Sequence, residues 1–148
     1  MQNVVILYGT ESGNAEMAAD DIAATLGASG IDGKVLPMEE FAVDELSQLG
    51  CVVLVTSTYG DGEMPDTAES FYSALGETRP DLSELTFAAF GLGDATYKTY
   101  NNAIDTLVKT VSDLGASQVG ETGRHDAASG KPLADTAVAW AKKTFALA

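Results

Sequence analysis

Hydrophobic residues along the chain alternate between short continuous runs and longer stretches where they recur at helical spacing. Continuous runs such as residues 4–8 and 51–55 predict strands that are buried on both faces. The stretch 102–114 places its apolar side chains on one face, which predicts a helix. In chain order, we predict strands at 4–8, 34–36, 51–55, 86–90 and 116–119, and helical segments at 15–28, 43–49, 65–75, 102–114 and 132–145.

This order makes five β/α units, which is typical of an α/β protein with a parallel sheet. Because the strands are apolar throughout, helices are expected on both faces of the sheet, giving a three-layer sandwich. The doubly wound strand order 2-1-3-4-5 with right-handed crossovers is the leading arrangement for five such units. We expect Pro37 to stop the second strand, and residues 1–148 to form one domain of ordinary size.

The chain carries 22 acidic and 8 basic residues, a net charge of −14. This charge argues against binding to nucleic acid or to anionic membranes. It suits a partner with a basic docking face, or it serves solubility alone. No apolar run approaches the ~20 residues needed to span a bilayer, and no signal sequence opens the chain, so we expect a soluble, cytoplasmic protein. The single cysteine, Cys51, excludes an internal disulfide and is expected to be a small buried side chain.

Three loops follow strands at the edge of the sheet where α/β proteins bind ligands. The first is Gly9-Thr10-Glu11-Ser12-Gly13-Asn14-Ala15. It offers hydroxyls, an amide side chain and backbone N–H groups at a helix N-terminus, which together suit a phosphate dianion. It matches neither a Walker loop nor the G-x-G-x-x-G fingerprint. The alternative is an ordinary helix start, capped by Ser12 or Asn14.

The second and third loops share one pattern, in which an aromatic residue stands beside glycines. Tyr59 precedes Gly60 and Gly62, and Tyr97 follows Gly91 and Gly93. The glycines allow a flat ligand to approach the backbone closely, and an aromatic residue on such a loop is better explained by stacking than by core packing. We therefore expect Tyr59 and Tyr97 to sandwich one planar ring system.

Taken together and in this order, the loops resemble those of short-chain flavodoxins. The phosphate-loop motif is Thr10-Glu11-Ser12-Gly13-Asn14, and the two ring-loop motifs are Thr56-Ser57-Thr58-Tyr59-Gly60-Asp61-Gly62 and Phe90-Gly91-Leu92-Gly93-Asp94-Ala95-Thr96-Tyr97. In detail they are similar to MioC-like flavodoxins and to the FMN domains of diflavin reductases. The match extends over the whole chain. It departs from many short-chain flavodoxins in having Tyr59 in place of Trp and Ala15 in place of Thr.

The resemblance implies non-covalently bound FMN at the switch point between the first and third strands. It implies an electron carrier that moves one or two electrons between a reductase and a redox partner, as a monomer and without catalytic residues or a metal. The phosphate would be bound by Thr10, Ser12, Gly13, Asn14 and Ala15, with Thr58 reaching the ribityl chain or phosphate. Around the ring the resemblance places Tyr59, Gly60, Asp61, Gly62, Gly91, Leu92, Gly93, Asp94, Tyr97 and Asp126, with Glu11 in the first loop.

Acidic residues crowd the same end of the sheet: Glu11, Asp61, Glu63, Asp66, Asp94 and Asp126. Their field is expected to disfavour added negative charge on the flavin and so to lower its potential. His125 falls in the predicted loop after the fifth strand, where it is either a solvated side chain or a pH-dependent influence on the flavin. Trp140, on the last helix, is expected to be a packing residue.

Three other functions share this fold. The chain is consistent with the FMN domain of a larger diflavin reductase, although the starting Met1 and the lack of a trailing linker favour a free-standing protein. A phosphoacceptor receiver domain would need an Asp at the end of the third strand, where this chain has Thr56-Ser57-Thr58. A flavodoxin-like quinone reductase or dehalogenase would need a substrate pocket or an acid–base pair, and no motif marks one.

Overall fold

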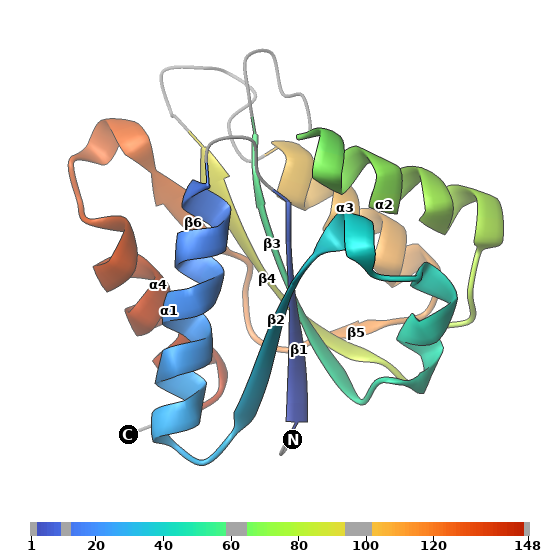
Figure 1. Cartoon of the computed structure of the whole chain (residues 1–148), viewed down its shortest axis with the longest axis horizontal. Coiled ribbons are helices and arrows are strands. Elements are labelled where there is room, and N and C mark those ends of the chain that lie inside the picture. Colours follow the sequence, from blue (N-terminus) through green and yellow to red (C-terminus); the bar gives the residue numbers. More distant parts are fainter. Residues whose placement is uncertain (1–2, 10–12, 59–64, 94–101, 147–148) are drawn as a thin grey trace.

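The computed structural model describes residues 3–9, 13–58, 65–93 and 102–146, and these form one parallel sheet between two layers of helices (Figure 1). The strands are β1 (Asn3–Gly9), β2 (Asp32–Pro37), β3 (Cys51–Ser57), β4 (Thr86–Gly93), β5 (Ser117–Gln118) and β6 (Gly123–Asp126). Their order is β2-β1-β3-β4-β5, and β6 also pairs with β4. Every pairing between these strands is parallel, so the predicted order 2-1-3-4-5 is confirmed.

Helices of the described chain cover both faces of the sheet. The α-helices are α1 (Asn14–Ala28), α2 (Asp66–Thr78), α3 (Asn102–Asp113) and α4 (Leu133–Thr144), and the 3-10 helices are η1 (Met38–Glu40), η2 (Val43–Gln48) and η3 (Ala127–Ser129). In Figure 1, α1 and α4 lie on one side of the sheet and α2 and α3 on the other. No helix within the described residues is both long enough and apolar enough to cross a bilayer.

Alternate residues of the central strands supply two separate cores. Val53 and Val55 of β3 pack with α1 and α4, while Val52 and Leu54 pack with α2 and α3. All seven residues of β3 are buried, which explains its uninterrupted apolar sequence. Cys51 opens this strand as a free, buried thiol, as expected, and burial raises its pKa. β3 therefore contributes side chains to both cores.

The last strand differs from its prediction. Residues 116–119 give only the two-residue β5, and the chain then leaves the sheet and returns as β6 beside the second half of β4. Residues 123–126 were expected in a loop because they have no apolar run. The close approach of this strand to Trp140 and Phe90 requires glycine at position 123, because a Cβ there would lie 2.4 Å from Trp140 Cδ1 and 2.5 Å from Phe90 Cδ1.

Smaller differences concern the ends of elements. β2 ends at Pro37, as expected, although Pro37 is itself the last strand residue, which an edge strand allows because it needs no further backbone donor there. The segment 43–49 is the 3-10 helix η2 and not an α-helix. Pro65 precedes the first residue of α2. Trp140 is a packing residue, as expected, with its ring centroid 5.3 Å from that of Phe90.

Candidate functional site

Three strands end together at one edge of the sheet. Gly9 of β1 is in register with Thr56 of β3, and Thr56 is in register with Gly91 of β4. The three strands that precede the loops identified in the sequence therefore end side by side, at the upper edge of the sheet in Figure 1. This edge includes the point between β1 and β3 where the strand order reverses, the usual ligand position in such a fold.

The start of α1 presents backbone amides at this edge. Gly13 occupies the N-cap position with φ of 89°, a left-handed conformation that favours glycine, and it supplies no side-chain cap. The first helical hydrogen bond is donated by Met17 N to Gly13 O, at 3.1 Å. The N–H groups of residues 14–16 precede it and have no intrahelical acceptor. Asn14 is thus the first helical residue and not the cap, and the helix start suits an anion.

Ser57 is a site residue that sequence reasoning missed. It ends β3 on the face that Val55 directs toward α1, and it is 6% exposed. Among the described residues its Oγ is the one buried side-chain oxygen or nitrogen without a hydrogen-bond partner. A buried hydroxyl without a partner costs free energy, so a ligand atom here would be well bound. The sequence signal was available: Ser57 follows an apolar strand directly and lies inside the second loop motif.

Thr58 lies at the junction of three elements. Its N–H donates to Leu92 O at 2.9 Å, and its Oγ1 accepts a hydrogen bond from Ala103 N of α3 at 3.0 Å. Gly91 and Leu92 are buried at the end of β4, and Gly93 is half-buried. The predicted residues of the second and third loops that are described therefore converge on one point.

A close approach between β1 and α2 fixes the start of the first loop. A Cβ on Gly9 would lie 2.5 Å from Ala68 Cβ, so any larger residue would push α2 away. Ala15, in turn, is fully buried among the residues that α1 directs at the sheet. The methyl group that stands where many short-chain flavodoxins have Thr thus belongs to the core of this chain.

Asp126 is held beside the end of β4. It is in register with Gly93, its Oδ1 accepts from Ala128 N at 2.9 Å, and its backbone oxygen accepts from Ser129 Oγ at 2.6 Å. His125 lies within β6 and not in a loop, with its Nε2 2.8 Å from Lys131 O.

The structure therefore brings together Gly13, Asn14, Ala15, Thr58, Gly91, Leu92, Gly93 and Asp126. The other predicted site residues, Thr10, Glu11, Ser12, Tyr59, Gly60, Asp61, Gly62, Asp94 and Tyr97, lie outside the described residues. Within the described ranges, no group of three or more His, Cys, Asp or Glu side chains is placed to hold a metal ion.

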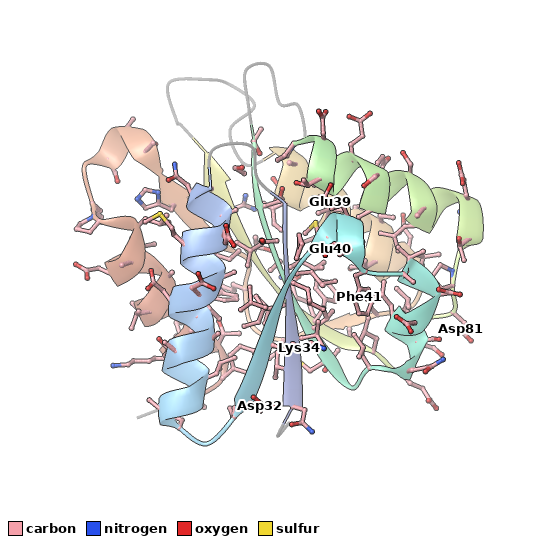
Figure 2. All side chains as sticks on the ribbon, in the orientation of Figure 1. Asp32, Lys34, Glu39, Glu40, Phe41 and Asp81 are labelled. Atoms are coloured by element: carbon pink, nitrogen blue, oxygen red, sulfur yellow. The ribbon has the colours of Figure 1, made fainter. Side chains whose placement is uncertain are left out.

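Further exposed carboxylates lie near this end of the sheet, in addition to the acidic residues that the sequence placed there. Glu39 and Glu40 lie on η1, directly after β2, and Figure 2 shows them beside the upper end of β1. Tyr8 OH donates to Glu16 Oε2 at 3.1 Å. Burial and that hydrogen bond, together with the charges of Glu16, Glu40 and Asp20, raise the pKa of Tyr8 to about 12. Burial is the largest cause of this raised pKa, and the nearby carboxylates add to it because their charge disfavours a tyrosinate anion.

The fold defines a class: a doubly wound α/β protein in which the uncapped start of α1 lies at the switch point of the sheet. The family model described as Flavodoxin matches residues 6–140. The chain belongs to the flavodoxin family, whose function is electron transfer on FMN.

Relatives and solved structures agree with this assignment. Protein MioC of Escherichia coli O157:H7 is 36% identical over 124 residues, covering 82% of each chain. Human NADPH–cytochrome P450 reductase is 35% identical over 130 residues, which is 84% of this chain and 19% of the reductase. The structure of a mutant flavodoxin from Pseudomonas aeruginosa superposes with a TM-score of 0.87 at 30% identity and 97% coverage of both chains. That of oxidised flavodoxin 2 from Bacillus cereus gives 0.85 at 30% identity, again over 97% of both chains.

Proposed function

We propose that this chain is a one-domain electron carrier that binds a single FMN at the carboxyl ends of β1, β3 and β4. The observation that carries the site is the hydroxyl of Ser57, which has no partner among the described residues and lies on the face toward α1. The first amides of that helix lack intrahelical acceptors. A phosphate monoester needs several donors at one point, and this hydroxyl and these amides are donors of that kind.

Different residues of the chain would bind the phosphate and the ring of the cofactor. The backbone of residues 13–15 and the hydroxyls of Thr10, Ser12 and Ser57 would bind the phosphate. Tyr59 and Tyr97 would cover the two faces of the ring, and the backbone of residues 60–62 would lie at its redox-active edge. Residues 91–94 and Asp126 would line the pyrimidine side. FMN, when bound, supplies the one- and two-electron chemistry, and the protein supplies orientation and electrostatics.

We propose a carrier without an enzymatic substrate of its own. Support comes from the surface charge, because Glu16, Glu39 and Glu40 are exposed around the proposed site and the net charge is −14. Such a surface suits transient docking of a monomer to reductases and acceptors with basic faces, and we place this exchange in the cytoplasm. Carboxylate repulsion would also hold the potential of the flavin down.

Binding by the FMN-free protein tests the proposal most directly. FMN should bind with one-to-one stoichiometry and riboflavin, which lacks the phosphate, should bind much more weakly. FMN titration without binding would refute the site. Equal affinities for FMN and riboflavin would refute the phosphate assignment while leaving the ring loops in place.

Electron transfer from the reduced holoprotein tests the docking proposal. Oxidation by a basic one-electron acceptor such as cytochrome c should slow steeply as ionic strength rises, because screening weakens attraction between charged surfaces. A rate that does not change with salt would contradict a charge-steered carrier.

A second candidate is a role as the FMN domain of a larger reductase. It is favoured by one observation, the similarity to NADPH-dependent diflavin oxidoreductase 1 of Cryptococcus neoformans, 33% identical over 97% of this chain and 24% of that protein. Electron acceptance in trans separates the two roles. A free carrier is reduced by a separate reductase with saturation at low concentration, whereas an excised domain is reduced only slowly.

A further inference from the structure

The N-terminal turn of α3 depends on a side chain from a distant part of the chain. Ala103 is the second residue of α3, so its N–H has no acceptor within the helix. The acceptor is Thr58 Oγ1, 45 residues earlier, at 3.0 Å. Ala103 is fully buried, so water is not available to replace this bond.

The same threonine also joins the ends of β3 and β4. Ser57 is the last residue of β3 in register with β4, opposite Leu92, and the N–H of Thr58 donates to Leu92 O at 2.9 Å. This bond holds β3 and β4 together one residue beyond their paired register. Thr58 is therefore bonded to the end of β4 by its backbone and to the start of α3 by its side chain.

These bonds fix both ends of the segment that connects β4 to α3. Its first end follows Gly93, which pairs with Asp126 of β6. At its second end, the Ala103 bond is joined by an ion pair between Asp105 of α3 and Arg124 of β6, at 2.6 Å. The intervening residues 94–101, the third loop of the proposed site, lie outside the described residues, but their two attachment points are set by these contacts.

We propose that Thr58 is a positioning residue, whose hydroxyl fixes the start of α3 against the ends of β3 and β4, beside the proposed ring site of the cofactor. This assignment rests on the proposed function. It gives the hydroxyl a role in the protein itself, in place of direct contact with the phosphate or the ribityl chain. The effect on cofactor binding is then indirect and concerns the ring.

Amide hydrogen exchange in FMN-free protein tests the contact itself. Thr58→Val keeps the shape of the side chain and removes the acceptor, so exchange at the Ala103 amide should accelerate at least tenfold. Thr58→Ser keeps the hydroxyl and should leave that amide protected. The amide of Val111, in the same helix, reports global stability, so in Thr58→Val the acceleration at Ala103 should exceed any acceleration at Val111. Unchanged protection of Ala103 in Thr58→Val would overturn the proposal.

Comparison of FMN with riboflavin separates positioning from direct binding. Loss of the fixed position of α3 should weaken both ligands by the same factor, about tenfold, in Thr58→Val, with recovery in Thr58→Ser. A loss confined to FMN would make Thr58 a phosphate ligand and overturn the proposal.

Thr110→Val is the matched control, because Thr110 Oγ1 donates to Thr106 O at 2.9 Å near the other end of α3. It should leave both affinities unchanged, so a similar loss in this variant would show that helix stability alone is responsible. If wild-type protein binds neither ligand, the proposed function fails, while the exchange experiment still decides the role of Thr58 in the fold.

Discussion

Removal of the Ser57 hydroxyl should have opposite effects on the FMN-free protein and on cofactor binding. In the FMN-free protein this buried oxygen has no partner within the described structure, and alanine fills almost the same volume. An unsatisfied buried hydroxyl costs roughly 1–3 kcal/mol in protein mutational data. Ser57→Ala should therefore stabilise the FMN-free protein by about 1 kcal/mol, which raises the midpoint of thermal unfolding by roughly 2–4 °C.

Cofactor binding should move the other way. A hydrogen bond to a charged group contributes about 1.5–3 kcal/mol, and about 1.4 kcal/mol corresponds to a factor of ten in affinity. Ser57→Ala should therefore weaken FMN binding by about 10- to 100-fold and leave riboflavin binding nearly unchanged. Urea unfolding of the FMN-free protein measures the first effect, and quenching of flavin fluorescence on titration measures the second.

Thr56 provides the control, because it is the neighbouring buried hydroxyl and is satisfied. Its Oγ1 lies 3.3 Å from Gly9 O and 3.2 Å from Ser57 O, on the opposite face of β3. Thr56→Val should destabilise the FMN-free protein by about 1 kcal/mol, since it removes a bond that exists. If Ser57→Ala also lowered stability and kept full FMN affinity, the hydroxyl would be an ordinary structural group and the phosphate assignment would be wrong.

Two further predictions concern packing and pH. Gly123→Ala places a methyl group 2.4 Å from the Trp140 ring, so it should destabilise the protein by roughly 1–3 kcal/mol in urea unfolding; a cost near zero would show that Trp140 moves aside freely. Tyr8 has a folded-state pKa raised from 10.0 to about 12, so its contribution to stability is complete below pH 10 and is lost as the pH rises through 12. Tyrosinate absorbance of wild type minus Tyr8→Phe should show a titration displaced to that range, and an ordinary tyrosine titration would contradict it.

The sequence carried most of the architecture because burial on both faces leaves an uninterrupted apolar pattern. β3 begins at Cys51 and β4 at Thr86, where the pattern placed them, and α3 begins at Asn102. The ends of the strands were harder to predict. β4 continues to Gly93 through a segment whose glycines allow close backbone approach. A glycine pairs through its N–H and C=O groups, and these leave no mark in a hydrophobic pattern.

For the site, the sequence predicted the location but not the contacts between distant residues. Loop motifs located the edge of the sheet and the start of α1, because turn and helix-start residues follow local rules. The unpartnered state of Ser57 within the described structure and the bond from Ala103 to Thr58 depend on which chain segments meet, so no local pattern reveals them. The same holds for Glu39 and Glu40, which reach this surface only because η1 follows β2.

β6 shows why a segment with no apolar run can still be held firmly in the sheet. Each of its four residues is tied to a different part of the protein: Gly123 fits under Trp140, Arg124 pairs with Asp105, His125 contacts Lys131 O, and Asp126 accepts from the backbone of η3. An exposed ion pair alone contributes little, so the strand depends on the sum of these contacts and on its pairing with β4. β6 borders the end of β4 and contacts α3, and Thr58 bonds to both of these elements, so together they fix the ends of β4 and α3 beside the proposed site. Preorganised loops reduce the entropy that cofactor binding must overcome. The hydrogen bonds of β6 are therefore part of the proposed cofactor site, although the side chains of Arg124 and His125 point to α3 and to Lys131.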